Sequence, residues 1–393
     1  MKNNWSKITL GDAIELKRGY DLPSNDREVG IIPIVSSSGV TDYHSVAKVK
    51  GPGVVTGRYG TIGEVFYLKE DFWPLNTTLY VKDFKGNDPR FFSYFLLCLG
   101  IKELNAAGAV PGVNRNHLHK IKISLPSPLT QRKIAAILSA YDDLIENNLK
   151  RIKLLEEKAQ LTYEEWFVRM KFPGHESTPI NEETGLPEGW GFKSLGDFTD
   201  VLKGKNITKS TIRDGNVPVV AGGLLPAYYH DTPNTKSPVI TVSASGANAG
   251  FTCLYHEDIW ASDCSYIDSS MTKYLHFIYS SMIHNQAKIY HFQKGAAQPH
   301  VYPKDLKRLE IIIPNEASLN TFEGIGSSIF SSVKVFQQQN KLLKEARDIL
   351  LPRLMTGMID VEKLDLSAFE QGDQEEMWMA AEESETYSKK QSL

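Results

Sequence analysis

The chain lacks the sequence patterns of a secreted, membrane-spanning or metal-binding protein. Its 393 residues include three cysteines, Cys98, Cys253 and Cys264, which form no CxxC pair. The first residues, MKNNWSKITL, contain no apolar core of a secretory leader, and no run approaches the ~18 apolar residues that a membrane span needs. An odd cysteine count without a leader is typical of reduced thiols. We therefore expect a cytoplasmic protein of two or three globular domains, with no metal site.

Catalytic signatures are also missing. The sequence has no GxxxxGK(S/T) phosphate loop, no GxGxxG nucleotide fingerprint, no HExxH and no GxSxG. It also lacks an Asn/Asp-Pro-Pro-aromatic tetrad for amino methylation of bases and an acidic nuclease constellation. The sequence therefore predicts a binding protein with no catalytic residues of its own.

The net charge is close to neutral, which is unusual for a nucleic-acid-binding protein. The 44 Lys and Arg against 47 Asp and Glu give a charge of -3. Residues 362–393 hold nine acids and three lysines, a local charge of -6, so that residues 1–361 carry +3. The acidic segment has no turn or strand signals and is expected to be disordered.

The chain contains an internal repeat. WSKITLGDAIELKRG (5–19) matches WGFKSLGDFTDVLKG (190–204) at an offset of 185 residues. Both copies consist of short apolar segments separated by turn residues, with one helical segment before the last strands. The repeat therefore predicts two similar mixed α and β domains. The same offset aligns two further pairs, Tyr43 with Tyr228 and Val55 with Ile240.

Each copy is followed by a long helical segment with a heptad seam. Between Pro128 and Pro173 no proline or glycine interrupts the pattern, and seam residues recur at spacings of four and three. A helix of about 40 residues spans roughly 60 Å, too long for the core of one globular domain. We expect the two helices to form an antiparallel coiled coil, because the second domain must return the chain. Two separate amphipathic helices, each lying on its own domain, are the alternative.

The predicted seam contains one polar residue in each helix, at equivalent positions. A buried Asn in a coiled coil fixes the register of the helices at some cost in stability. The seam residues are Ile134, Leu138, Tyr141, Ile145, Asn148, Ile152 and Leu155 in the first helix, and Phe322, Ile329, Val333, Phe336, Asn340, Leu343 and Leu350 in the second.

The predicted fold class is α+β, with two similar mixed α/β domains separated by two long helices. The predicted segments are a first globular domain (1–126), a central long helix (127–172), a linker (173–189), a second globular domain (190–314), a C-terminal long helix (315–358) and an acidic tail (359–393).

The loops of the two copies differ far more than the strands do. Loops rich in Lys, Arg, Asn, Gln, Ser and Tyr supply the side chains that bind phosphates and read base edges. The loop GRYGTIG (57–63) is explained either as a strand-connecting turn or as a nucleic-acid contact with Arg58 and Tyr59 at its tip. The predicted DNA-binding residues are Lys17, Arg18, Tyr20, Ser37, Tyr43, Arg58, Tyr59, Arg115 and Asn116 in the first copy, and Lys203, Lys205, Asn206, Lys209, Tyr228, Tyr229, Asn248, Gln298 and His300 in the second.

The order of globular copy, long helix, globular copy and long helix resembles the specificity subunit of type I restriction-modification enzymes. Three phrases carry the resemblance: PLTQRKIAAILSAYDDLIENNLKRIKLLEEKAQLTYEEWFVRMKFPG (128–174), TGLPEGW (184–190) and LLPRLMTGMIDV (350–361). The first and third resemble the family's helices and the second the start of its second recognition domain. The acidic tail departs from the usual short ending.

The resemblance implies a non-catalytic DNA-recognition subunit of a phage-defence system. Each domain would read one half of a bipartite site, and the coiled coil would set the spacer between the halves. Two modification methyltransferase subunits, which bind S-adenosylmethionine, would methylate adenine, and restriction subunits would use ATP and Mg for translocation and cleavage. This chain would bind none of these cofactors. A cytosolic coiled-coil scaffold with paired protein- or glycan-binding domains is the alternative function.

Overall fold

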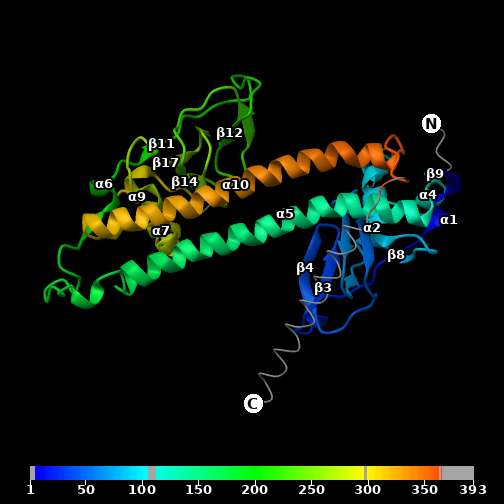
Figure 1. Ribbon diagram of the computed structural model, residues 1–393, viewed down its shortest axis with the longest axis horizontal. Coiled ribbons are helices and arrows are strands. Elements are labelled where there is room, and N and C mark those ends of the chain that lie inside the picture. Colours follow the sequence, from blue (N-terminus) through cyan, green and yellow to red (C-terminus); the bar gives the residue numbers. More distant parts are fainter. Residues whose placement is uncertain (1–4, 105–111, 296–298, 363, 365–393) are drawn as a thin grey trace, which may run out of the picture. The chain divides into compact units, whose positions relative to one another are not determined.

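The contacts within the chain divide it into two units, of which the first combines two segments that are distant in sequence and the second is one continuous segment. The computed structural model describes residues 5–104, 112–295, 299–362 and 364. Unit 1 consists of Met1–Ile145 and Lys341–Leu393, and unit 2 of Glu146–Asn340. Each unit therefore combines one copy of the repeat with parts of both long helices (Figure 1).

The globular part of unit 1 is a mixed α and β domain. A four-stranded antiparallel sheet has the order β2-β8-β5-β6, a three-stranded sheet has the order β4-β3-β7, and β1 pairs with β9. Its elements are β1 (Ser6–Thr9), α1 (Leu10–Ala13), β2 (Glu15–Arg18), β3 (Ile32–Ser36), β4 (Gly39–His44), β5 (Gly53–Gly57), β6 (Val65–Leu68), β7 (Trp73–Pro74), β8 (Thr78–Asp83), α2 (Pro89–Cys98), α3 (Ile101–Leu104), α4 (Arg115–His119) and β9 (Lys122–Leu125).

The globular part of unit 2 repeats this topology. Its sheets have the orders β11-β17-β14-β15 and β13-β12-β16, and β10 pairs with β18. The predicted duplication and the α+β fold class are thus confirmed. The elements are β10 (Gly191–Ser194), α6 (Leu195–Phe198), β11 (Leu202–Lys203), β12 (Val217–Val220), β13 (Tyr228–His230), β14 (Val239–Ser243), β15 (Thr252–Tyr255), β16 (Trp260–Ala261), β17 (Cys264–Asp268), α7 (Leu275–His284), α8 (Gln286–His291), α9 (Pro303–Leu306) and β18 (Glu310–Ile313).

The strand registers correct the predicted alignment of the two copies by one residue. Val55 lies opposite Tyr80, whereas Thr241 lies opposite Tyr266, so Val55 corresponds to Thr241 and not to Ile240. The connection between the first two strands of the smaller sheet is longer in unit 2, where residues 221–227 separate β12 from β13. An added residue in a hairpin connection shifts everything that follows without disturbing the strands. For the same reason Tyr43 corresponds to Tyr229, because both lie opposite the equivalent prolines Pro33 and Pro218.

The two long helices end earlier than the sequence predicts. α5 spans Pro128–Tyr163 and continues as one π-helical turn, Glu164–Val168, while α10 spans Glu316–Met355. Met170 has a positive φ of 59°, and the chain turns there so that the Phe172 side chain enters the core of unit 2. The predicted end of the first helix at residue 172 is therefore too late.

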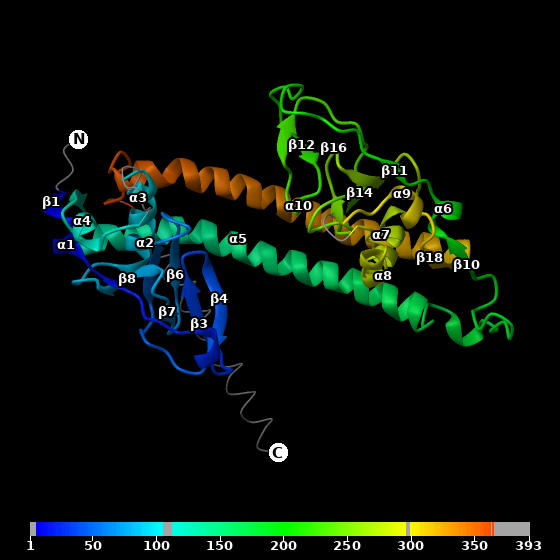
Figure 2. The same cartoon turned by 180° about the vertical axis from the view of Figure 1, so that it is seen from behind.

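Inside each unit a stretch of α5 packs against a stretch of α10 that runs in the opposite direction (Figures 1 and 2). In unit 1, Ile134 near the start of α5 shares a core with Leu354 near the end of α10. In unit 2, the Phe167 and Phe322 rings lie 5.2 Å apart, at the end of α5 and the start of α10. The helices therefore form the expected antiparallel coiled coil, and all fourteen predicted seam residues are buried or half-buried.

A polar contact lies within this apolar seam. The Asn148 side-chain amide donates to Asn340 Oδ1 at 3.0 Å, and both residues are buried. Gln339 Oε1 lies 3.4 Å from the same donor. Because a shift of the helices would bury these amides against apolar groups, the pair favours this register over others.

The segments predicted as linker and tail are partly folded onto the units. Leu186 of the linker is buried in the core of unit 2. Val361, placed in the predicted disordered tail, is buried in the core of unit 1, and Lys133 Nζ donates to the carbonyl oxygens of Glu362 and Leu364. The tail prediction is therefore wrong for residues 359–362 and 364, because an apolar side chain there completes a core. Residues 365–393 lie outside the described residues.

Each globular part is attached to a long helix by a carboxylate. In unit 1, Asp142 of α5 accepts hydrogen bonds from Tyr94 Oη of α2 and from Arg347 Nη1 of α10, the latter at 2.6 Å. In unit 2, Glu323 of α10 accepts from the backbone N–H groups at the start of α7 and lies 2.6 Å from His276 Nδ1. The His276 and His256 rings both stack on Phe330 of α10.

We predict that the Asn148–Asn340 pair is coupled. Asn148→Leu should lower the free energy of unfolding by roughly 1–3 kcal/mol, because the Asn340 amide loses a buried partner. The double variant Asn148→Leu/Asn340→Leu should recover most of that loss, since an apolar pair suits the seam. Urea unfolding measures the free energy of unfolding of the single and the double variant, and Asn147→Leu, at an exposed neighbouring position, is the control. A double variant that loses the sum of the two single effects would contradict the coupling.

We also predict that unit 2 loses stability as the pH falls from 6.5 to 4. Burial, followed by the positive charges of His276 and Lys334, lowers the pKa of His256 from 6.5 to about 4. The unfolded chain therefore binds a proton at a higher pH than the folded chain, so the neutral ring stabilises the fold fully above 6.5 and loses this contribution toward pH 4. The loss is on the order of 3 kcal/mol.

The measurement is the free energy of urea unfolding at several pH values between 7 and 4. His256→Phe keeps an aromatic ring beside Phe330 and should flatten the profile relative to the unchanged chain. His291→Phe, at an exposed position of α8, is the matched control. Parallel profiles for the His256 variant and the unchanged chain would show that this histidine does not control the pH dependence.

Candidate nucleic-acid interface

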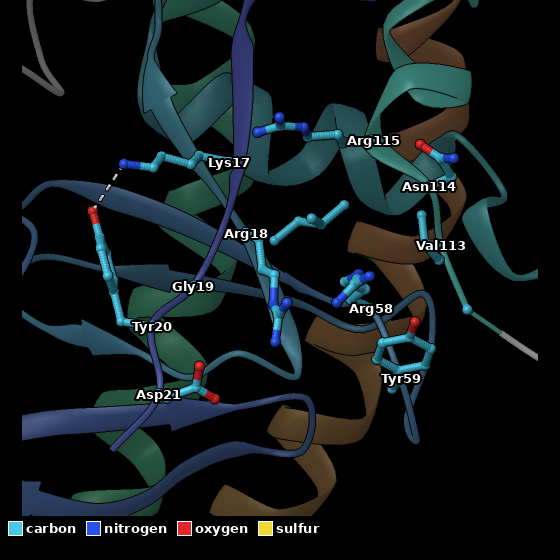
Figure 3. A pocket seen from close by; sticks show the side chains of 12 residues that line it. Lys17, Arg18, Gly19, Tyr20, Asp21, Arg58, Tyr59, Val113, Asn114 and Arg115 are labelled. Atoms are coloured by element: carbon cyan, nitrogen blue, oxygen red, sulfur yellow. Dashed lines mark hydrogen bonds between the residues drawn. The ribbon is translucent and has the colours of Figure 1, made fainter.

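A pocket of about 680 Å³ lies in unit 1 beside the ends of two strands of the larger sheet (Figure 3). Polar and cationic side chains dominate its lining. Its residues are Lys17, Arg18, Gly19, Tyr20, Asp21, Arg58, Tyr59, Leu79, Gly112, Val113, Asn114 and Arg115.

The sheet order explains why distant residues meet here. β2 and β5 both pair antiparallel with β8, so they run parallel to each other and end at the same edge of the sheet. Arg18 is the last residue of β2, and Arg58 follows the last residue of β5. Both strand ends therefore present a cation at one edge.

The short helix α4 brings a third cationic residue to the same edge. The Asn114 side chain caps α4, and Arg115 is its first residue. The Val113 N–H donates to the Arg58 carbonyl at 3.0 Å, and His119 Nε2 accepts from the Leu16 N–H of β2 at 2.9 Å. Burial, followed by the charge of Arg115, lowers the pKa of His119, which favours the neutral ring that this contact requires.

Two glycines allow the backbone to pack closely around the pocket. A Cβ at Gly19 would lie 2.2 Å from the carbonyl oxygen of Leu75, and one at Gly112 would lie 2.3 Å from the Tyr59 ring. Neither position has room for a side chain. These glycines fix the path of the chain on both sides of the cationic residues.

The tyrosines of the pocket position its cations. The Lys17 Nζ donates to the Tyr20 hydroxyl at 3.2 Å, and the Tyr20 and Tyr80 hydroxyls lie 2.9 Å apart. The hydrogen bond with Tyr80 is the main cause that lowers the pKa of Tyr20. The guanidinium carbon of Arg58 lies 4.4 Å from the centre of the Tyr59 ring.

The pocket is strongly positive in a chain whose net charge is -3. Four cationic side chains and one carboxylate, Asp21, line it. Within the described part of the chain, no carboxylate forms an ion pair with Arg18, Arg58 or Arg115. Unneutralised cations around an open, polar cavity suit a polyanionic ligand.

The structure gathers most of the residues predicted to bind DNA in unit 1. Lys17, Arg18, Tyr20, Arg58, Tyr59 and Arg115 all line the pocket. Ser37 and Asn116 are not part of the lining, although Asn116 directly follows Arg115 on α4. Tyr43 lies on β4 in the other sheet and is not part of the lining.

The sequence analysis missed some of the lining residues. Asp21 and Asn114 belong to the pocket but were not predicted to bind DNA. The signal for Asn114 was available, because an asparagine directly before a short helical segment is a typical N-cap.

The predicted residues of unit 2 are spread over several loops. Lys203 ends β11, the Lys205 carbonyl accepts from Trp260 Nε1 at 2.8 Å, and Asn206 follows it. Lys209 Nζ lies 5.6 Å from the centre of the Tyr228 ring, and Tyr229 is the exposed neighbour on β13. The Asn248 carbonyl accepts a hydrogen bond from the Phe251 N–H, and the His300 ring stacks on Tyr302. Gln298 lies outside the described residues.

The cationic set of unit 1 is not repeated in unit 2. By strand register Lys17 corresponds to Leu202, and the residue after β5, Arg58, corresponds to Ala244 after β14. Lys203 corresponds to Arg18, so this position carries a cation in both units. The same scaffold therefore carries unlike side chains at these positions in the two units.

Among the described residues, no group of three or more His, Cys, Asp or Glu side chains is arranged to hold a metal ion. Within the same part of the chain, no helix is long and apolar enough to cross a membrane.

Comparison with known proteins identifies the family. The sequence model of the family described as "Type I restriction modification DNA specificity domain" matches residues 2–157 and 187–348. The MjaIX specificity subunit of a type I restriction enzyme from Methanocaldococcus jannaschii is 29% identical over 294 residues, which cover 67% of this chain and 66% of that protein. A putative type I specificity subunit from Mycoplasma pneumoniae is 26% identical over 377 residues, covering 90% of this chain and 96% of that protein.

A crystal structure shares the fold. The S subunit of a type I restriction-modification system from M. genitalium superposes with a TM-score of 0.62 at 17% identity, covering 90% of this chain and 96% of that chain. The family match covers both copies of the repeat and most of both long helices. The chain therefore belongs to the type I restriction-modification DNA specificity family, as a recognition subunit with two specificity domains.

Proposed function

We propose that unit 1 binds duplex DNA at the cationic pocket and that unit 2 reads a second, different half of the same bipartite site. The concentration of four cations around one cavity in a nearly neutral chain carries this proposal. Arg, Lys, Tyr and Asn are the residue types that contact phosphates and base edges. The family assignment disfavours the alternative of a protein- or glycan-binding scaffold.

The antiparallel coiled coil is proposed to set the spacer between the two half-sites. Long helices with a fixed register act as stiff elements, and the Asn148–Asn340 hydrogen bond favours one register. The unlike side chains of the two units suit an asymmetric site, because equivalent positions such as Arg58 and Ala244 cannot make the same contact.

The partners are proposed to supply the chemistry. Two modification methyltransferase subunits would carry S-adenosylmethionine and methylate adenine, and restriction subunits would use ATP and Mg to translocate and cleave DNA in the cytoplasm. The named relatives are specificity subunits of type I restriction enzymes, which supports such an assembly. This chain is proposed to bind the DNA and its partners without a cofactor of its own.

Each long helix carries an apolar stripe outside the seam, which supports the docking of two copies of one partner. Leu154 and Leu161 of α5 are 64% and 58% exposed and border a groove of about 430 Å³ in unit 2. Leu342 and Ile349 of α10 in unit 1, each 188 residues later, are 64% and 55% exposed. Equivalent exposed apolar pairs on duplicated helices suit the same helical segment of two identical partners.

We predict that the cations beside Arg58 bind phosphates. The triple variant Lys17→Gln/Arg18→Gln/Arg115→Gln should weaken binding to all duplexes. The slope of log affinity against log salt should become shallower by about 0.9 for each lost phosphate contact. Fluorescence anisotropy over a salt series measures both effects, with Lys122→Gln, an exposed lysine on β9, as the matched control. An unchanged salt slope in the triple variant would place the DNA elsewhere.

We predict that each apolar stripe holds one methyltransferase subunit. The double variant Leu154→Asp/Leu161→Asp should lose one partner copy, and Leu342→Asp/Ile349→Asp should lose the other. In both cases binding of the partner would bury two carboxylates in an apolar contact. The variants should fold, since surface substitutions change stability by about 0.5 kcal/mol or less. The mass of the purified complex by light scattering reports the stoichiometry. Leu149→Asp, at an exposed leucine off the stripe, is the control, and retention of two copies by both double variants would refute the assignment.

A further inference from the structure

The backbone at Arg58 is held from three sides. β5, which ends one residue before it, is an interior strand of the four-stranded sheet, and its five residues are all buried. The N–H groups of Arg58 and Tyr59 both donate to the Thr77 carbonyl, at 2.9 and 3.2 Å. The Arg58 carbonyl accepts from Val113 at 3.0 Å. The Cα position of this arginine is therefore fixed by the scaffold rather than by a mobile loop.

The side chain of Arg58 is oriented as well. Its guanidinium carbon lies 4.4 Å from the centre of the Tyr59 ring, a cation–π contact that holds the planar group against an aromatic face. The ring in turn fits against Gly112, where a Cβ would lie 2.3 Å from it. A guanidinium stacked in this way keeps the N–H groups along its edge available for a ligand.

The other cations of the pocket are less constrained. Arg18 and Arg115 are exposed, at the end of a strand and the first residue of a short helix. Lys17 donates to Tyr20 and is a point charge without a planar fork. These side chains suit phosphate contacts, which tolerate variable geometry. Arg58 is the cation whose position and plane are both fixed.

A fixed, planar arginine matches one base. The guanidinium fork binds O6 and N7 of guanine with two parallel hydrogen bonds in the major groove, and no other base presents two acceptors there. A side chain already held in place loses less conformational entropy on binding. We propose that Arg58, stacked on Tyr59, reads a guanine in the half-site bound by unit 1; this rests on the proposed DNA-binding function of the pocket.

The same position in unit 2 cannot read guanine in this way. Ala244 follows β14 where Arg58 follows β5, and Ser245 replaces Tyr59. The Ser245 hydroxyl donates to the Asp263 carboxylate. The charged group beside this position in unit 2 is therefore an anion that accepts hydrogen bonds, whereas in unit 1 it is the Arg58 cation. The guanine therefore belongs to one half of the bipartite site, and the half-site of unit 2 is read by other chemistry.

The test uses the full chain assembled with its methyltransferase subunits. Duplexes with randomised sequence are selected by the complex and sequenced, for the unchanged chain and for Arg58→Lys, Tyr59→Phe, Tyr59→Leu and Arg115→Gln. Arg58→Lys retains the charge but loses the fork, and the two Tyr59 variants retain or lose the aromatic face. Affinity for the selected site is measured over a salt series, and thermal unfolding checks that each variant folds.

The unchanged complex should select two half-sites, one with an invariant guanine. Arg58→Lys should lose the preference at that base alone, with affinity on the order of 10- to 100-fold lower and an unchanged salt slope. Tyr59→Leu should weaken the same preference while Tyr59→Phe retains it. Arg115→Gln should keep the motif, weaken all duplexes alike and reduce the salt slope by about one.

Two outcomes separate the inference from the function on which it rests. If Arg58→Lys selects the original motif with its guanine intact, Arg58 does not read that base, although the complex still recognises DNA. If the unchanged complex selects no motif at all, the proposed function fails, and the guanine assignment fails with it.

Discussion

The antiparallel packing of α5 against α10 is the contact on which both units depend. Isolated amphipathic helices of 36 and 40 residues cannot bury their apolar faces alone. Each globular part buries residues from the end of the helix that follows the other copy of the repeat. Leu351 and Leu354 at the end of α10 enter the core of unit 1, and Tyr163 and Phe167 at the end of α5 enter the core of unit 2. The core of unit 1 therefore needs the C-terminal part of α10 as well as the first repeat, whereas the core of unit 2 lies within Glu146–Asn340 and includes parts of both long helices.

The polar contacts along this packing determine how the helices meet rather than how tightly. Asp142 links α2, α5 and α10 in unit 1 through Arg347 and Tyr94, whereas Glu323 holds the start of α7 in unit 2. Half-buried ion pairs add little net stability, because desolvation offsets much of the attraction. Their loss would leave an unpaired charge beside an apolar core, so they disfavour alternative arrangements. The two globular parts are therefore attached to the long helices by residues at different positions of the repeat.

Periodic features of the sequence predicted the fold well, whereas contacts between segments distant in the sequence could not be predicted from it. Seam residues recur every three or four positions, so the coiled coil follows from spacing alone. The one-residue error at Val55 arose in a hairpin connection, where an insertion leaves the apolar pattern intact. Val361 was assigned to a disordered tail because acidic neighbours mask one apolar residue. The pocket unites residues nearly 100 positions apart, and only the sheet order brings the ends of β2 and β5 to one edge.

The repeated openings show why one scaffold can carry two unlike sets of loop side chains. Both end in a glycine, and a Cβ at Gly19 or Gly204 would lie 2.2 Å from a backbone carbonyl oxygen of the adjoining strand region. Close backbone approach fixes glycine in both copies. The side chains next to it carry no such constraint, so that Leu202 stands where the first copy has Lys17, and Lys205 where it has Tyr20. In unit 1 the positions that the fold leaves free line the cationic pocket, and the two copies differ beside the glycine that neither can change.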